Sequence, residues 1–134
     1  MTEFYNLPDN IKSDMLKEKF IEFLVCYSNN TTKENINYVL DELSELSDRQ
    51  WNTYENLDNE VKCQIEKFLI SVIDFENESI MDSILCIIPR LGLENLFLYV
   101  LSKKDVIVNK KVVQNIIESK TEYGETVSNP YADM

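Results

Sequence analysis

Apolar residues recur along this chain at the spacing of one face of an α-helix. The first instance begins at Leu16 and continues with Phe20, Phe23, Leu24 and Tyr27, at the i+4, i+7, i+8 and i+11 positions. This spacing is typical of a helix that buries one stripe, and the template returns as far as residue 117. Two glycines and three prolines are too few for the tight turns of a β-sandwich or barrel. The pattern therefore predicts an all-α protein.

Capping residues divide this pattern into about seven helices. Thr31 and Glu34 have the spacing of a capping box, and Ser47 or Asp48 can cap the helix that follows. The expected antiparallel pairs are 8–28 with 32–46, 48–56 with 59–75, and 78–90 with 93–103, and a seventh helix starts near residue 109. Short links between helices favour stacked hairpins. Two architectures fit, a short HEAT-like α-solenoid and a plain helical bundle.

We expect a single helical domain over residues 1–120 and a flexible tail over residues 121–134. The chain of 134 residues has the length of one ordinary domain, and its last segment, TEYGETVSNPYADM, has no periodicity. The stretch Val106-Ile107-Val108 is β-branched but has no obvious partner strand. We expect it to be a buried lead-in to the last helix.

The net charge of −11 is concentrated in the middle of the chain. Between Glu34 and Asp82 there are 13 acidic and three basic residues, and elsewhere 11 acidic residues nearly balance 10 basic ones. Such a charge repels nucleic acid and anionic membrane surfaces, so we expect neither as a partner. The apolar runs are also too short to cross a bilayer.

The cysteines point to a reducing compartment. Cys26, Cys63 and Cys86 are an odd set without CxxC spacing, and each lies in an apolar run. The first residues show no basic segment followed by an apolar stretch, so we expect no secretory signal. The expected location is the cytoplasm.

The residue inventory argues against catalysis. The chain has no histidine, which removes the commonest general base and the commonest metal ligand, and it has no glycine-rich phosphate loop. Acidic residues at 74, 76, 78 and 82 resemble the start of a calcium loop. However, Ser79 and Leu85 stand where such a loop needs Gly and Glu. We therefore expect a binding protein with no cofactor and no metal, and a carboxylate- and metal-dependent enzyme remains an alternative.

The acidic segment is the candidate binding surface. Like charges at i, i+4 spacing, such as Asp41 with Glu45, destabilise a helix slightly. An acidic excess that persists despite this cost favours a basic partner. Aromatic residues in the same segment are candidates for a packed interface centre. The predicted partner-binding residues are Asp41, Glu42, Glu45, Asp48, Trp51, Tyr54, Glu55, Asp58 and Glu60.

In style, the chain resembles the immunity proteins of contact-dependent growth inhibition and other polymorphic toxin systems of bacteria. The opening LPDNIKSDMLKEKFIEFL carries this likeness, and the later IIPRLGLENLFLYVL looks HEAT-like. The resemblance implies a cognate toxin domain, bound one to one by a chain that is monomeric beforehand. It further implies that this toxin is a nuclease with a basic cleft, with a ribonuclease slightly preferred.

Two other binding roles remain open from the sequence. One is an acidic helical adaptor, or a nucleic-acid mimic that inhibits another protein. The other is a homodimeric structural protein that uses its apolar C-terminal helices as the interface.

Overall fold

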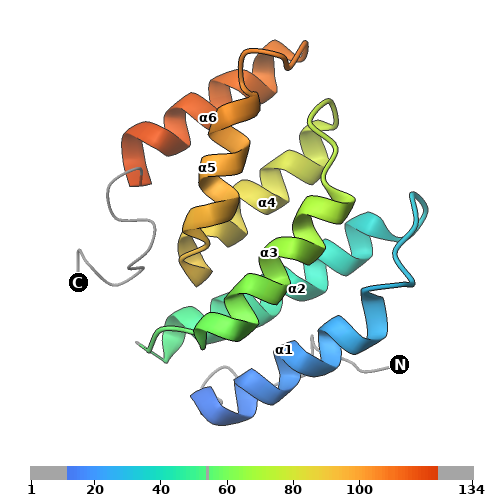
Figure 1. Cartoon of the computed structure of the whole chain (residues 1–134), viewed down its shortest axis with the longest axis vertical. Helices are drawn as coiled ribbons and strands as arrows, with labels where there is room; N and C mark the ends of the chain where they lie inside the picture. Colours follow the sequence, from blue (N-terminus) through green and yellow to red (C-terminus); the bar gives the residue numbers. More distant parts are fainter. Residues whose placement is uncertain (1–11, 54, 124–134) are drawn as a thin grey trace.

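Six α-helices make up the described part of the chain (Figure 1). The computed structural model describes residues 12–53 and 55–123. Its helices are α1 (Ser13–Tyr27), α2 (Ile36–Asn52), α3 (Asn59–Val72), α4 (Glu78–Leu91), α5 (Glu94–Lys103) and α6 (Lys110–Tyr123). No strand occurs in these residues. The predicted all-α class is confirmed.

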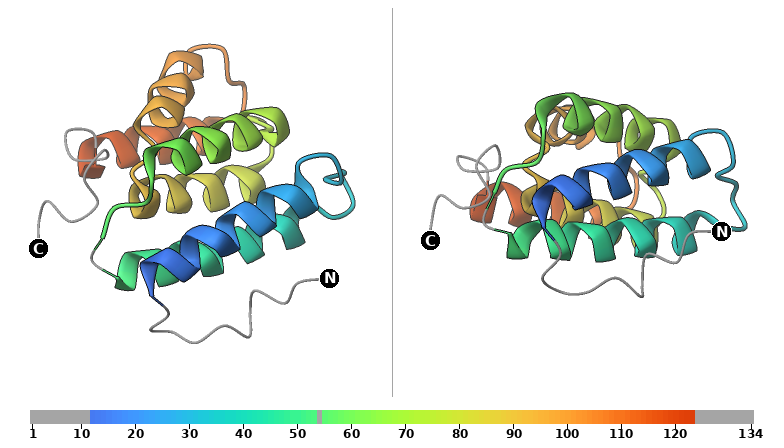
Figure 2. Two further views of the ribbon diagram at one scale, coloured as in Figure 1. Left: turned by 60° about the horizontal axis from the view of Figure 1, so that its bottom comes forward. Right: turned by 90° about the horizontal axis from the view of Figure 1, so that it is seen from below.

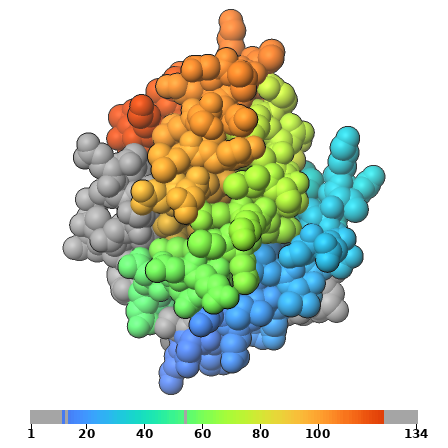
Figure 3. Space-filling view, viewed as in Figure 1, coloured from blue at the N-terminus to red at the C-terminus, as the bar shows by residue number. Residues whose placement is uncertain are grey.

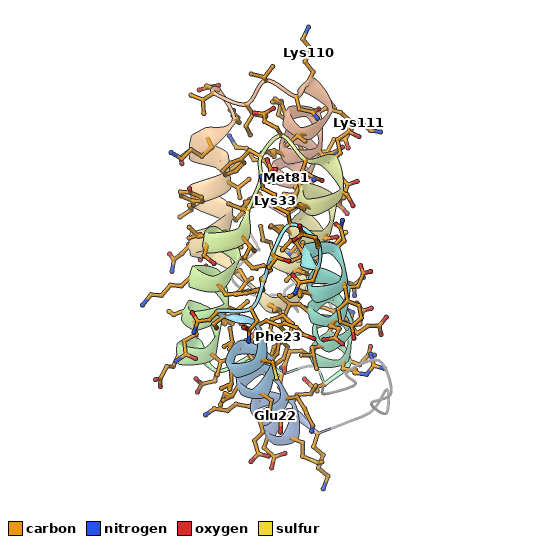
Figure 4. All side chains as sticks on the ribbon, turned by 90° about the vertical axis from the view of Figure 1, so that its right-hand side faces the viewer. Glu22, Phe23, Lys33, Met81, Lys110 and Lys111 are labelled. Atoms are coloured by element: carbon orange, nitrogen blue, oxygen red, sulfur yellow. The ribbon has the colours of Figure 1, made fainter. Side chains whose placement is uncertain are left out.

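The helices form two layers of stacked hairpins. α1, α3 and α5 make one layer, and α2, α4 and α6 make the other (Figures 2 and 4). Within the layers α1 packs on α3, α3 on α5, α2 on α4, and α4 on α6. The pairs α1–α2, α3–α4 and α5–α6, which we call hairpins, follow one another along this helical bundle.

The core runs between the two layers without interruption. It contains the first predicted stripe, with Leu16, Phe20 and Phe23 fully buried, and continues through all six helices. α4 is the most apolar helix and lies in the middle of its layer, against both α2 and α6. Its buried residues are Ile80, Met81, Ile84, Leu85, Ile87, Ile88 and Leu91.

The segment that the sequence divides into helices 32–46 and 48–56 is one continuous helix, α2. Ser47 does not cap a new helix, because it is buried and its Oγ donates a hydrogen bond to the Leu43 carbonyl, 2.8 Å away. Asp48 instead reaches Arg90 of α4. The expected capping box does not form either, since the Thr31 hydroxyl donates to the Tyr27 carbonyl, 2.7 Å away. Hence the described residues contain six helices instead of about seven.

The link between α5 and α6 corrects another expectation. Ile107 packs against the core, but Val106 and Val108 are 72% and 82% exposed. Val106 ends the turn that follows α5, with its N–H bonded to the Lys103 carbonyl, so of the three residues only Ile107 packs inward. The stretch is therefore not a buried lead-in.

α6 continues to Tyr123, past the expected domain end at residue 120, and residues 124–134 of the expected tail lie outside the described residues. In the part of the chain that is described, no helix has both the length and the apolar character needed to cross a bilayer.

Candidate functional site

Three of the predicted acidic residues share the exposed side of α2. Asp41, Glu45 and Asp48 are spaced i, i+4 and i+7, so they line one face of the helix. The opposite side is core, with Val39, Leu43 and Leu46 on it among others. Because the apolar residues fix how α2 is rotated, the carboxylates must face outward. We name Asp41, Glu45 and Asp48 the acidic α2 face.

Two arginines of the chain already contact this face. Arg49 places Nη1 2.7 Å from Glu45 Oε2, and its own side chain is almost fully buried. Arg90 of α4 places Nη1 2.9 Å from Asp48 Oδ1, and both of these side chains are about half exposed. Asp41 is exposed and forms no ion pair with the described residues. Solvent therefore reaches all three carboxylates of the acidic α2 face, and one of them, Glu45, is also held by a buried arginine.

Glu42 does not belong to the surface, which corrects the prediction. It is fully buried, and Tyr27 of α1 donates its hydroxyl hydrogen bond to Glu42 Oε2 at 2.7 Å. No described residue hydrogen-bonds the other oxygen, Oε1. Position 42 is rotated by about 100° from position 41, which turns its side chain toward α1. Burial and the neighbouring Glu42 carboxylate raise the pKa of Tyr27 above its usual range.

The aromatic residues proposed as the centre of the interface are placed differently. Trp51, in the last turn of α2, is half-buried, and Tyr54 lies outside the described residues. The aromatic side chain exposed beside the acidic α2 face is instead Tyr38, which is 42% exposed. Tyr38 precedes Asp41 by three residues, and this helical spacing could have identified it from the sequence.

The remaining predicted acids lie where α2 connects to α3. Glu55 is exposed in the link, and its backbone carbonyl accepts a hydrogen bond from Gln50 Nε2 at 2.7 Å. Glu60 is exposed in the first turn of α3. α3 belongs to the other layer of the fold, so these acids do not extend the acidic α2 face.

Asp58 has a structural role at the same place. Its Oδ1 accepts hydrogen bonds from the backbone N–H groups of Glu60 at 3.0 Å and Val61 at 3.2 Å, which caps α3. Lys17 of α1 lies 3.5 Å from Oδ2. The Val61 N–H is the main cause that holds the pKa of Asp58 below its usual value, with Lys17 contributing. Helix capping explains this acid without a partner.

Acidic residues of the group at 74–82 also form hydrogen bonds within the protein. The Glu76 carboxylate accepts hydrogen bonds from the backbone N–H groups of Val108 at 3.1 Å and Asn109 at 2.8 Å. Asp82 accepts a bond from Asn115 Nδ2 at 2.9 Å. These contacts join the second hairpin to the third. Over residues 12–53 and 55–123, no group of three or more acidic or cysteine side chains is arranged to hold a metal ion.

The site thus reduces to an exposed row of carboxylates with an aromatic residue beside it. Exposed carboxylates accept hydrogen bonds from lysine and arginine side chains, and arginine can do so through two N–H groups at once. Comparison of the chain with protein-family models, with curated proteins and with solved structures finds no match in any of the three. The chemistry of the acidic α2 face is therefore the basis for a functional proposal.

Proposed function

We propose that this chain is an immunity protein, which binds and neutralises a cognate bacterial toxin domain through the acidic α2 face. The observation that supports this most is the alignment of Asp41, Glu45 and Asp48 on the exposed side of one helix. At 1.5 Å rise per residue the row is about 10 Å long, enough to meet several basic side chains at once. Complementary fields of this kind speed association and fix orientation.

The expected toxin is a nuclease. The active-site cleft of a nuclease binds phosphates and is basic, so it would complement the charge of the acidic α2 face. The carboxylates of the acidic α2 face would occupy the place of the substrate phosphates, and among nucleases we favour a ribonuclease. Tyr38 supplies an exposed aromatic side chain next to this row. Aromatic residues of this kind often contribute much of the binding energy at interfaces.

The internal ion pair of Asp48 with Arg90 is compatible with such binding. Both side chains are about half exposed, and an exposed pair of this type contributes only about 0–1 kcal/mol. An arginine of the partner can therefore take the place of Arg90 at little cost. Glu45 differs, because its partner Arg49 is buried, and replacing Glu45 would remove a charge-assisted contact of that arginine.

The test is affinity capture from lysate of the cells that make the chain, with baits that differ in charge. The variant Asp41→Lys with Asp48→Lys reverses the two exposed carboxylates and leaves the buried Arg49 contact intact. The matched control, Glu118→Lys with Glu122→Lys, makes the same charge change on α6, where both residues are exposed. We expect wild type and control to retain one basic partner at low salt and partly at high salt. The α2 variant should lose it.

The captured partner is then assayed for ribonuclease activity with and without an equimolar amount of the chain. Loss of activity upon mixing supports neutralisation. Equal capture by all three baits would show that the partner does not use the acidic α2 face. If no bait retains a protein, the proposed function is wrong.

A further inference from the structure

Exposed apolar side chains are concentrated at the two ends of the stack of hairpins. Among the described residues, the middle hairpin α3–α4 exposes one large apolar side chain, Ile70. The first hairpin exposes Met15, Ile21, Val25 and Tyr38, and the third exposes Leu98, Val106, Val108 and Ile117. Figure 3 shows α1 and the α5–α6 hairpin at opposite ends of the molecule. Among the described residues, the middle hairpin has a neighbouring hairpin on either side, whereas each end hairpin has a neighbour on one side.

Three valines at these ends are largely exposed. Val25 is 77% exposed on α1, and Val106 and Val108 are 72% and 82% exposed at the other end. Terminal hairpins of helical-repeat proteins normally carry a polar outer face, because no further repeat covers them. Here both terminal hairpins keep large apolar side chains exposed.

The valines between α5 and α6 are held in place by the fold. Ile107 packs against the core, and the Glu76 carboxylate binds the backbone N–H groups of Val108 and Asn109. Asn109 Oδ1 also accepts hydrogen bonds from the first turn of α6. Since this segment is already ordered, burying its valines against another molecule costs little additional entropy.

The two ends also differ in charge. On α1, Asp14, Glu18 and Glu22 share the exposed stripe that carries Val25. Lysines at 12, 17 and 19 balance these acids in number, and Lys17 and Lys19 pair with Asp58 and Glu22. The third hairpin carries Lys103, Lys104, Lys110 and Lys111 around its exposed valines, with Asp105 as the one acid in that stretch. Figure 4 shows Glu22 at one extreme of the molecule and Lys110 at the other. The exposed stripe of α1 around Val25 is therefore acidic, whereas residues 103–111 carry four lysines and one acid, with Lys111 in an ion pair with Glu78 at 3.8 Å.

We infer that the chain associates end to end with a second copy of itself, with α1 of one copy packed on the α5–α6 link of the next. Val25 would meet Val106 and Val108, and the acids of α1 would face the lysines. Such a contact joins two different surfaces, so each copy keeps one open end and assemblies lengthen with concentration. The resemblance to immunity proteins instead implies a chain that is monomeric before it binds its toxin.

The test is sedimentation velocity over a wide range of protein concentration. We expect the mean mass of the wild type to rise with concentration, and the rise to weaken in high salt. Val25→Arg places a cation against the lysines, and Val108→Asp places an anion against the acids of α1. Each should weaken self-association about tenfold or more, since each removes a buried valine and adds a repulsion. Both positions are exposed, and circular dichroism checks that the variants remain helical.

An equimolar mixture of the two variants distinguishes end-to-end contact from a symmetric dimer. The mixture contains one intact α1 end and one intact α5–α6 end, so association should return. Ile70→Arg, on the middle hairpin, should associate as the wild type does. The inference is overturned if the wild type stays monomeric at every concentration, if only one of the two end variants has an effect, or if mixing restores nothing.

Discussion

At the scale of single residues, the Tyr27–Glu42 pair is the least expected feature. A carboxylate that is fully buried receives one hydrogen bond from the described residues, and its second oxygen receives none. Burial of a charged group is costly unless hydrogen bonds compensate for the lost water. The pair joins α1 to α2, so the packing of the first hairpin depends on the Tyr27 hydroxyl.

Replacing Tyr27 with phenylalanine removes a single oxygen atom, and we expect this small change to destabilise the protein clearly. We expect the free energy of unfolding to fall by about 1–3 kcal/mol, because Glu42 would stay buried without its donor. Urea denaturation measures this change. The double variant Tyr27→Phe with Glu42→Leu should recover part of the loss, since no buried charge remains. If the single variant is as stable as the wild type, Glu42 does not depend on Tyr27.

At the scale of helices, α5 shows how one element can be capped by another. Its N-cap position is Leu93, which has no side-chain acceptor, so the sequence offers no local cap. Glu66 of α3 supplies one, because its carboxylate accepts a hydrogen bond from the Leu96 backbone N–H at 2.7 Å and is itself buried. A negative charge at this position also interacts favourably with the helix dipole.

Removal of this remote cap should weaken the contact between α3 and α5. We expect Glu66→Ala to lower the free energy of unfolding by about 1–3 kcal/mol, since a buried N–H loses its acceptor. Glu66→Gln should cost less, because its side-chain oxygen can still accept the bond. Lys67→Ala, on the exposed side of α3, should change stability by less than about 0.5 kcal/mol. Equal stability of Glu66→Ala and Lys67→Ala in urea denaturation would contradict this role.

At the scale of the whole molecule, the acidic excess divides into carboxylates that hold the fold together and carboxylates that face solvent. Glu66 joins α3 to α5, and Glu76 joins the α3–α4 link to the start of α6. Asp58 caps α3. The row on α2 faces solvent, as do single acids such as Glu55 and Glu60. The net charge alone therefore overstates the acidic surface, and the topology decides how much of it is available.

The link made by Glu76 predicts that stability can be changed locally. In Glu76→Ala the N–H groups of Val108 and Asn109 lose their acceptor, so the start of α6 should open more often. We expect hydrogen exchange at these two amides to accelerate by about fivefold to tenfold, because the free energy of local opening should fall by roughly 1 kcal/mol. Amides in α1 and α2 should exchange as in the wild type, and Asp41→Ala provides a control of equal charge change. A uniform acceleration across all helices would instead indicate global destabilisation.

The sequence by itself determined the helical class, most of the helix positions and the stripes that form the core. These properties depend on the spacing of apolar residues within one segment, and this spacing can be read directly from one sequence. Phe20, Ile65 and Ile84 are buried because each lies in such a stripe. The acidic α2 face could also be predicted in part, since Asp41, Glu45 and Asp48 have helical spacing.

Only the tertiary structure decided which acids remain on the surface. Glu42 stands beside Asp41 in the sequence, but a rotation of about 100° turns it toward the Tyr27 hydroxyl of α1. Asp58 and Glu76 are occupied by backbone N–H groups, and those of Glu76 come from a segment more than thirty residues away. Local spacing specifies what each helix buries, whereas the partner of each polar side chain depends on which helices the fold brings together.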